Sequence, residues 1–174
     1  MAAPDREVYV LVGDGSYLML NSEIVTAIQE GIKIIIVLVV NHGFQSIGAL
    51  SESVGVERLG TQYRRRDNTG QLNGDHLPTD LALNAQSFGA SVLRTSTIAE
   101  FAEALATARN NDVTTVVVIE TDPSVAGPDS MSWWDVPVAE VAQRVSTREA
   151  LERYEVGRKV QRTYLKPTSL PPSQ

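Results

Sequence analysis

Three short apolar runs, all rich in β-branched residues, constrain the fold of this chain more than any other feature. They occupy residues 8–12, 34–40 and 116–119. None of them alternates with polar residues, which is typical of parallel strands buried on both faces. Between these runs lie three stretches with the helical spacing of apolar residues, at 22–30, 80–88 and 98–110. A shorter strand candidate covers residues 90–93. The alternation predicts an α/β fold, a parallel sheet with helices on both faces.

The ends of the first of these helices are marked in the sequence. Asn21 or Ser22 is available as the N-cap, and Gly31 follows the last turn, where a left-handed C-cap costs little. The segment 41–79 is different, because it is rich in Gly, Ser, Asn and Arg and has no sustained period. A stretch this long inside a compact domain predicts a functional loop, or one that hides a short helix around residues 49–53.

The last part of the chain has another composition. Turn-forming residues follow Thr121, and then come Trp133-Trp134, a charged helical pattern from about Val138 to Leu165, and a tail rich in Pro and Ser. We therefore predict two regions, a main α/β module at 1–128 and a C-terminal arm at 129–174. We expect the two tryptophans to anchor this arm by packing.

Composition excludes several classes of function. The 174 residues suffice for one domain with a sizeable core, and the net charge of −6 disfavours a nucleic-acid partner because it repels phosphate. The chain has no cysteine, so a disulfide framework, a cysteine zinc site and a thiol nucleophile are excluded, and a cytoplasmic location is expected. The longest uninterrupted apolar run has seven residues, whereas a membrane span needs about 20.

Suggestive residues follow two of the predicted strands. Gly13-Asp14-Gly15-Ser16 comes after the first, and Asn41-His42-Gly43-Phe44 comes after the second. In doubly wound sheets, ligands bind at the carboxyl ends of the strands. A carboxylate, an amide oxygen and a turn carbonyl there suit a Mg²⁺ ion bridged to a diphosphate, and N–H groups at the start of a helix favour phosphate. Gly-Asp-Gly alone, without the second motif, is better read as an ordinary turn with an Asx hydrogen bond.

The two motifs together carry a resemblance. Gly-Asp-Gly, 25 further residues and then Asn-x-Gly resembles the diphosphate-binding module of thiamine-diphosphate enzymes. The resemblance implies that Asp14, Asn41 and the Gly43 carbonyl bind Mg²⁺, and that Gly13, Gly15, Ser16, Asn41, Gly43 and Phe44 form the cofactor site. It also shows one departure, because Val40 stands where the family has the first Asn of a pair.

Further segments narrow this resemblance to one branch. They are Gly60-Thr61-Gln62-Tyr63-Arg64, Leu77-Pro78-Thr79-Asp80 and Ser132-Trp133-Trp134-Asp135-Val136. They look like the trihydroxycyclohexane-1,2-dione hydrolase branch, which takes part in myo-inositol catabolism. This implies a small cyclic diketone as substrate, a ring opened by C–C bond cleavage, thiamine diphosphate and Mg²⁺ as cofactors, and a homo-oligomer.

The same resemblance implies that one component lies elsewhere. In these enzymes a glutamate of a separate pyrimidine-binding domain, usually on a partner subunit, activates the cofactor. Glu23, Glu30 and Glu52 do not match it, so we assign no catalytic residue in this chain. We expect the chain to be the C-terminal portion of a longer enzyme and to be inactive alone.

Several alternatives stay open at this point. Another thiamine-diphosphate enzyme, of the acetolactate synthase or decarboxylase type, shares the cofactor motif. A haloacid-dehalogenase-type phosphatase also carries Gly-Asp-Gly, but it needs an Asp-x-Asp nucleophile, which this sequence lacks. The third alternative is a non-catalytic fragment that binds Mg²⁺-diphosphate and acts in assembly. His42 is as much a candidate for packing, or for supporting a metal ligand, as for ligand contact. His76 is expected to be a loop residue rather than one that faces the active site, and Arg64 to Arg66 a solvated charge run rather than an anion-neutralising group at a subunit interface.

Overall fold

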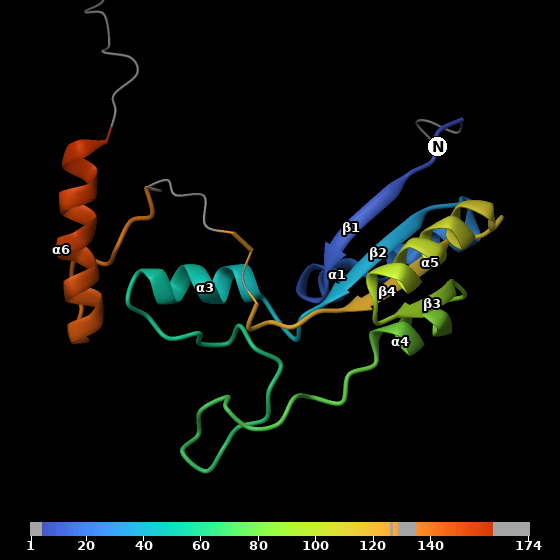
Figure 1. Ribbon diagram of the computed structural model, residues 1–174. Coiled ribbons are helices and arrows are strands. Elements are labelled where there is room, and N and C mark those ends of the chain that lie inside the picture. Colours follow the sequence, from blue (N-terminus) through green and yellow to red (C-terminus); the bar gives the residue numbers. More distant parts are fainter. Residues whose placement is uncertain (1–4, 126, 129–134, 162–174) are drawn as a thin grey trace, which may run out of the picture. The chain divides into compact units, whose positions relative to one another are not determined.

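The structure, a computed structural model, describes residues 5–125, 127–128 and 135–161 (Figure 1). The elements follow in the order β1 (Tyr9–Gly13), α1 (Asp14–Leu20), α2 (Glu23–Gln29), β2 (Ile35–Val40), α3 (Gln45–Ser53), α4 (Leu81–Ser87), β3 (Ser91–Thr95), α5 (Ile98–Asn110), β4 (Thr115–Glu120) and α6 (Val145–Val160). The predicted alternation of strands and helices is confirmed. The structure adds α1 as a separate helix that begins directly after β1.

The four strands form one parallel sheet in the order β1-β2-β4-β3. The central strands β2 and β4 are buried along most of their length, as their unbroken apolar sequences predicted. The prediction that residues 8–12 are buried on both faces is wrong. β1 lies at the edge of the sheet, where it pairs with β2 alone among the described residues, and Leu11 is 76 % exposed.

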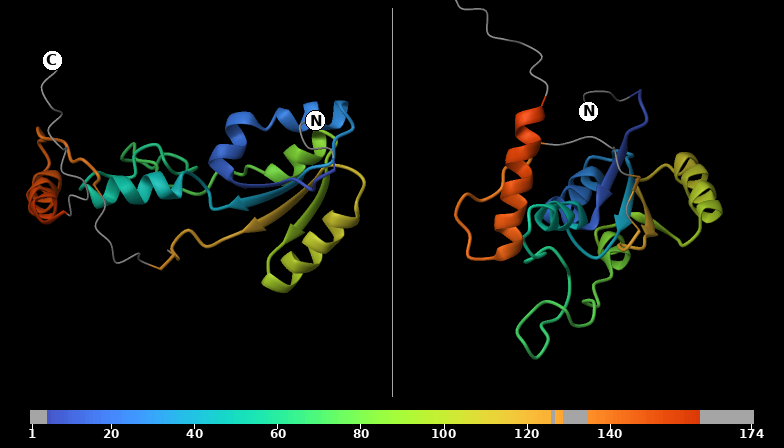
Figure 2. Two further views of the ribbon diagram at one scale, coloured as in Figure 1. Left: turned by 90° about the horizontal axis from the view of Figure 1, so that it is seen from above. Right: turned by 60° about the vertical axis from the view of Figure 1, so that its left-hand side comes forward.

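Helices cover both faces of the sheet. Successive side chains of a strand point to opposite sides, so the apolar central strands present apolar side chains on both faces. On one face, Ile36 and Leu38 pack with residues of α1, α2 and α4 in the larger core cluster. On the other face, Ile35 and Val117 pack against Ala104 and Ala108 of α5. Figure 2 shows α5 on the side of the sheet opposite to α1 and α2. The predicted layers are therefore confirmed.

The helix ends follow the sequence signals in part. Ser22 occupies the N-cap position of α2, but its side chain makes no capping hydrogen bond. Gly31, just beyond α2, has φ +62°, which is the left-handed conformation expected at that end. Asp80 is the N-cap of α4 and accepts a hydrogen bond from the Leu83 N–H.

The segment between β2 and α4 contains α3, which begins earlier than the helix expected around residues 49–53. Gly48, a poor helix former, hid this start. A Cβ there would lie 2.8 Å from Thr61 Oγ1 and 3.1 Å from the Arg58 guanidinium, so close packing explains the glycine. Glu52, expected in a loop, lies in α3.

The chain divides into two compact units: residues 1–48 with 58–126, and residues 49–57 with 127–174. In the second unit, the Gly55 carbonyl accepts hydrogen bonds from Ser146 Oγ and Thr147 Oγ1 at the start of α6, at 2.8 and 2.9 Å. Arg144 forms an ion pair with Glu57 at 2.7 Å. These contacts tie the start of α6 to the residues that follow α3. Trp133-Trp134, expected to anchor this region, lie outside the described residues. None of the helices described is long and apolar enough to cross a membrane.

Candidate metal centre

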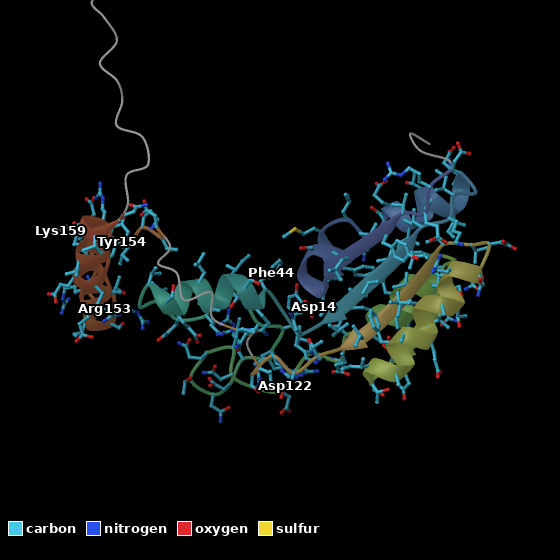
Figure 3. All side chains as sticks on the ribbon, turned by 45° about the horizontal axis from the view of Figure 1, so that its top comes forward. Asp14, Phe44, Asp122, Arg153, Tyr154 and Lys159 are labelled. Atoms are coloured by element: carbon cyan, nitrogen blue, oxygen red, sulfur yellow. The ribbon has the colours of Figure 1, made fainter. Side chains whose placement is uncertain are left out.

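The carboxyl ends of β1 and β2 lie side by side, since Gly13 pairs with Val39 in the parallel register. Asp14 follows Gly13 directly as the first residue of α1, and Asn41 follows β2 by one position. The two motifs singled out in the sequence therefore meet at the carboxyl ends of the strands. Figure 3 shows Asp14 at this point, with Phe44 next to it.

The Asp14 side chain is buried, with 1 % of the residue exposed. Its carboxylate accepts the backbone N–H of Asn41 at 3.0 Å and that of Gly43 at 3.2 Å, and Oδ1 also accepts the N–H of Gly15 at 2.7 Å. Charge-assisted bonds of this kind hold a carboxylate firmly. Asp14 thus joins the start of α1 to the turn after β2.

The Asn41 amide is the second component, and its orientation follows from its neighbours. Its inner terminal atom lies 2.8 Å from the Gly43 carbonyl oxygen and 3.2 Å from Asp14 Oδ1. With Nδ2 inward, the amide donates hydrogen bonds to both oxygens. With Oδ1 inward, three oxygens from three residues converge with no proton between them, an arrangement that a cation stabilises.

The turn after β2 is shaped by backbone conformations that few residues adopt. His42 has φ +60° and Gly43 has φ +143°. A Cβ at Gly43 would collide with the Thr61 carbonyl, so a glycine is required there. The following residue, Phe44, donates its N–H to the same Thr61 carbonyl at 2.8 Å, and Gly43 pairs with Gln62 in an antiparallel bridge.

The remaining predicted residues lie around this turn. Gly13 has no atom within 4 Å of the place of a Cβ, so its surroundings are open, and Ser16 is exposed. At Gly15 a Cβ would lie 2.6 Å from the Phe44 ring. The structure therefore gives the second glycine a reason that sequence reasoning missed: it makes room for Phe44.

The composition of the site limits the ions that fit it. Within the described part of the chain, no group of three or more His, Cys, Asp or Glu side chains is placed to hold a metal. Asp14 contributes a carboxylate here, Asn41 an amide and Gly43 a backbone carbonyl. A donor set of one carboxylate, one amide and one carbonyl suits a hard cation that takes its other ligands from phosphate and water.

Sequence reasoning missed several neighbours of the site, because they come from segments remote in the chain. Tyr63 lies edge-on to Phe44 with ring centroids 6.0 Å apart. Burial, and then the negative charge of Asp14, raise the pKa of Tyr63. Glu120, the last residue of β4, lies 2.8 Å from His42 Nε2. Tyr63 stands in the segment 60–64, which narrowed the resemblance but did not place it at the site, and Glu120 belongs to no motif singled out in the sequence.

The rings of His42 and His76 are stacked, with centroids 4.2 Å apart and planes 10° from parallel. Loss of hydration, followed by the positive charges of His42 and Arg64, lowers the pKa of His76. His76, expected to be a loop residue, lies in the segment between α3 and α4, where it is exposed, faces His42 and forms an antiparallel bridge with Arg64. Two open cavities of about 320 and 240 Å³ adjoin His42, and the smaller one is also lined by Arg58, Arg64 and His76.

Comparison with known sequences gives one family and a set of curated relatives. The family described as "Thiamine pyrophosphate enzyme, C-terminal TPP binding domain" matches residues 1–119. A protein of Clostridium perfringens strain 13 is 40% identical over 164 residues, and one of Geobacillus thermodenitrificans is 38% identical over 165 residues. Both are named 3D-(3,5/4)-trihydroxycyclohexane-1,2-dione hydrolase. Each match covers 94% of this chain and 26% of the relative, so the chain spans about a quarter of these proteins.

Solved structures give the same fold. The match to benzoylformate decarboxylase from Polynucleobacter necessarius covers 72% of this chain and 21% of that protein, with a TM-score of 0.58 and 21% identity. A thiamine diphosphate-dependent 4-hydroxybenzoylformate decarboxylase from Rhodococcus jostii RHA1 covers 70% of this chain and 21% of its own, with a TM-score of 0.53 and 27% identity. The predicted α/β architecture is confirmed by these matches.

Proposed function

Because the chain belongs to the family of C-terminal thiamine-pyrophosphate-binding domains of thiamine pyrophosphate enzymes, we propose that it is the cofactor-binding portion of a trihydroxycyclohexane-1,2-dione hydrolase. The whole enzyme would open the ring of this cyclic diketone by cleaving a C–C bond. The hydrolase is preferred over a decarboxylase because two relatives near 40% identity carry that name over 94% of the chain.

We assign a Mg²⁺ ion to Asp14, Asn41 and the Gly43 carbonyl. The support is the convergence of their oxygens when the Asn41 amide points its Oδ1 inward. The separations of 2.8 and 3.2 Å bracket the spacing of neighbouring ligands in an octahedral Mg²⁺ shell, which is about 2.9 Å for metal–oxygen bonds of 2.0–2.1 Å. Val40 in place of the family's first Asn does not alter this donor set.

In this proposal the diphosphate binds at the same carboxyl ends of β1 and β2. Gly13 leaves open space beside the backbone, and Ser16 offers an exposed hydroxyl next to the first turn of α1. Phe44 covers Gly15 and so fixes the relation between the two motifs. A diphosphate supplies the negative charge that Asp14 alone does not, and it completes the ligand shell of the ion.

The division of labour follows from these assignments. Thiamine diphosphate supplies the electron sink for C–C bond cleavage, and the protein supplies binding and placement. This chain holds the cation and the diphosphate end. We assign the activating glutamate to a pyrimidine-binding domain outside the chain, because Glu23 and Glu30 are exposed on or beside α2 and Glu52 is exposed on α3. A cytoplasmic location, the cyclic diketone substrate and the homo-oligomer remain predictions.

Calorimetric titration tests the cofactor assignment. The chain is titrated with thiamine diphosphate in the presence of Mg²⁺, first alone and then after addition of the N-terminal portion of a relative, expressed separately. We expect saturable binding that Asp14→Ala abolishes, and gel filtration should then report a larger assembly with the added portion. The proposal fails if neither sample binds the cofactor, or if Asp14→Ala binds it as well as the unaltered chain.

A further inference from the structure

His42 is the one non-glycine residue with a positive φ among the residues that the structure describes. Its φ of +60° is the left-handed conformation, which is costly for a residue with a Cβ. Such strain persists where the surroundings impose it, and it is often found at functional sites. His42 lies between Asn41 and Gly43, two of the residues assigned to the cation.

The left-handed turn brings the two flanking residues to one carboxylate. In an extended chain, N–H groups two residues apart are separated by about 6.6 Å, which is too far for both to donate to one carboxylate oxygen at hydrogen-bond distance. In this turn the N–H groups of Asn41 and Gly43 lie 3.0 and 3.2 Å from Asp14 Oδ2. The same turn directs the Gly43 carbonyl toward the Asn41 amide at 2.8 Å.

Contacts from remote segments hold His42 in this conformation. Its Nε2 lies 2.8 Å from Glu120 Oε1 at the end of β4, and its ring stacks on His76 at 4.2 Å. Its carbonyl accepts the N–H of Tyr63 at 3.0 Å. The side chain is 24 % exposed, so these partners enclose most of it.

His76 is in turn fixed by its own strand-like pairing. It bridges Arg64, the Leu77 N–H donates to the Tyr63 carbonyl at 2.9 Å, and the Arg64 guanidinium donates to the Gly74 carbonyl at 3.2 Å. The loop that carries His76 thus presents its ring to His42 in a defined position.

We propose that His42 is a positioning residue of the cation site, and that the Glu120 carboxylate and the His76 ring brace its left-handed backbone. His42 touches neither the assigned cation nor its ligand oxygens in this role. It acts through the geometry of Asn41 and Gly43. That the brace serves a cation site rests on the proposed function. The contacts that brace His42 are present without any ligand.

Hydrogen exchange of the Gly43 amide, followed by NMR on the full metal-free chain, tests the brace directly. We expect His42→Ala to exchange faster at Gly43 than His42→Gly, by about fivefold to thirtyfold, since alanine pays the left-handed cost and glycine does not. A side chain that serves packing alone predicts the reverse order, because glycine fills less space. The amide of Leu38, in the buried strand β2, serves as the reference for an intact fold.

The partners of His42 supply matched variants. His76→Ala removes the stacked ring, whereas His76→Phe keeps a flat ring, so the first should speed Gly43 exchange and the second should leave it within about twofold. Glu120→Ala should act as His76→Ala does, and Glu120→Gln, which retains an oxygen and a nitrogen at that place, should act as His76→Phe does. Equal exchange at Gly43 in all these variants and in the unaltered chain overturns the proposal.

Titration with Mg²⁺ and thiamine diphosphate separates the two proposals. If the unaltered chain binds, His42→Ala should weaken binding more than His42→Gly does, by the same factor as in exchange. If the chain binds and both variants bind equally well, the positioning role is overturned while the cofactor assignment stands. If the unaltered chain does not bind even with the N-terminal portion added, the cofactor assignment fails, and the exchange series still decides whether His42 is braced.

Discussion

The side-chain amide of Asn41 points its inner atom at Asp14 Oδ1, 3.2 Å away, and that atom also lies 2.8 Å from the Gly43 carbonyl oxygen. A nitrogen in this place joins the two oxygens by hydrogen bonds. An oxygen in this place is repelled by both unless a cation lies between them. The orientation of one amide therefore distinguishes the metal-free site from the metal-bound site that we propose.

Asn41→Asp tests this relationship, because it replaces a group that can donate by one that only accepts. We expect the metal-free variant to lose about 1–3 kcal/mol of unfolding free energy at neutral pH, since a second carboxylate then faces Asp14 without a proton. Urea denaturation with and without Mg²⁺ and thiamine diphosphate measures it. The ligands should restore more stability to Asn41→Asp than to the unaltered chain.

Asn41→Ala is the matched control, since it has neither the repulsion nor the ligand oxygen. It should lose less stability than Asn41→Asp in the absence of metal and gain little when the ligands are added. An equal response of both variants to the ligands would contradict the assignment of Asn41.

Asp14 should contribute to stability as well as to binding. Asp14→Ala leaves the N–H groups of Asn41 and Gly43 without their acceptor, and each such loss costs about 1–3 kcal/mol. Asp14→Asn keeps one acceptor oxygen and should cost less. Both should fail to bind Mg²⁺. Urea denaturation measures the difference, and equal stability of the two variants would show that these backbone bonds contribute little.

The two glycines of the first motif should differ in their tolerance of a side chain. Gly15→Ala places a Cβ 2.6 Å from the Phe44 ring, and such overpacking costs about 1–3 kcal/mol. Gly13→Ala meets nothing within 4 Å and should change stability by less than about 0.5 kcal/mol. Phe44→Leu should relieve Gly15→Ala, so that the double variant is more stable than the sum of the single effects predicts.

The strand ends that build the site were predictable, because local patterns define them. Unbroken apolar runs marked β1, β2 and β4, and a parallel sheet brings the carboxyl ends of neighbouring strands together. Asp14 and Asn41 were therefore expected near each other. The position of β1 at the edge of the sheet was not predictable. β1 has the composition of a buried strand, yet its Leu11 is exposed.

The brace around His42 was not predictable from the sequence, and the reason is physical. Glu120 and His76 reach His42 across separations of 78 and 34 residues, and neither stands in a motif. The left-handed conformation of His42 is also only weakly marked in the sequence, since histidine adopts positive φ more often than most residues but far less often than glycine. Likewise Gly48 concealed the start of α3, because tertiary packing overrode a low helix propensity.

Asp80 should stabilise α4 chiefly as its cap. It accepts the Leu83 N–H at 2.9 Å and pairs with Arg94 at 2.7 Å. Asp80→Ala should cost about 1 kcal/mol through the lost cap, whereas Arg94→Ala should cost less than about 0.5 kcal/mol because the ion pair is exposed. Asp80→Asn retains the capping oxygen and should resemble Arg94→Ala. Thermal denaturation of the three variants ranks them, and an Asp80→Asn as unstable as Asp80→Ala would contradict the cap.

The same bonds give Asp80 a dependence on pH. The Leu83 N–H, and then Arg94, lower the pKa of Asp80 below its usual 3.8. The folded protein therefore holds this proton less tightly than the unfolded chain does, so the stabilisation is present above pH 3.8 and is lost as the pH falls below it. The stability difference between the unaltered chain and Asp80→Asn should narrow on acidification through that range, as urea denaturation at successive pH values can measure.

Tyr17 should limit stability at high pH. Burial raises the pKa of Tyr17 from 10.0 to about 12, and its hydroxyl donates to Asn84 Oδ1 at 2.8 Å, which links α1 to α4. The folded state holds the proton more tightly than the unfolded chain, so the stabilisation is complete below pH 10.0 and is lost as the pH rises toward about 12. Tyr17→Phe should cost about 1 kcal/mol near neutral pH, because the hydrogen bond is removed. Its deficit relative to the unaltered chain should shrink above pH 10.0 in urea denaturation, and a deficit that stays constant would show that Tyr17 ionises as readily in the folded as in the unfolded chain.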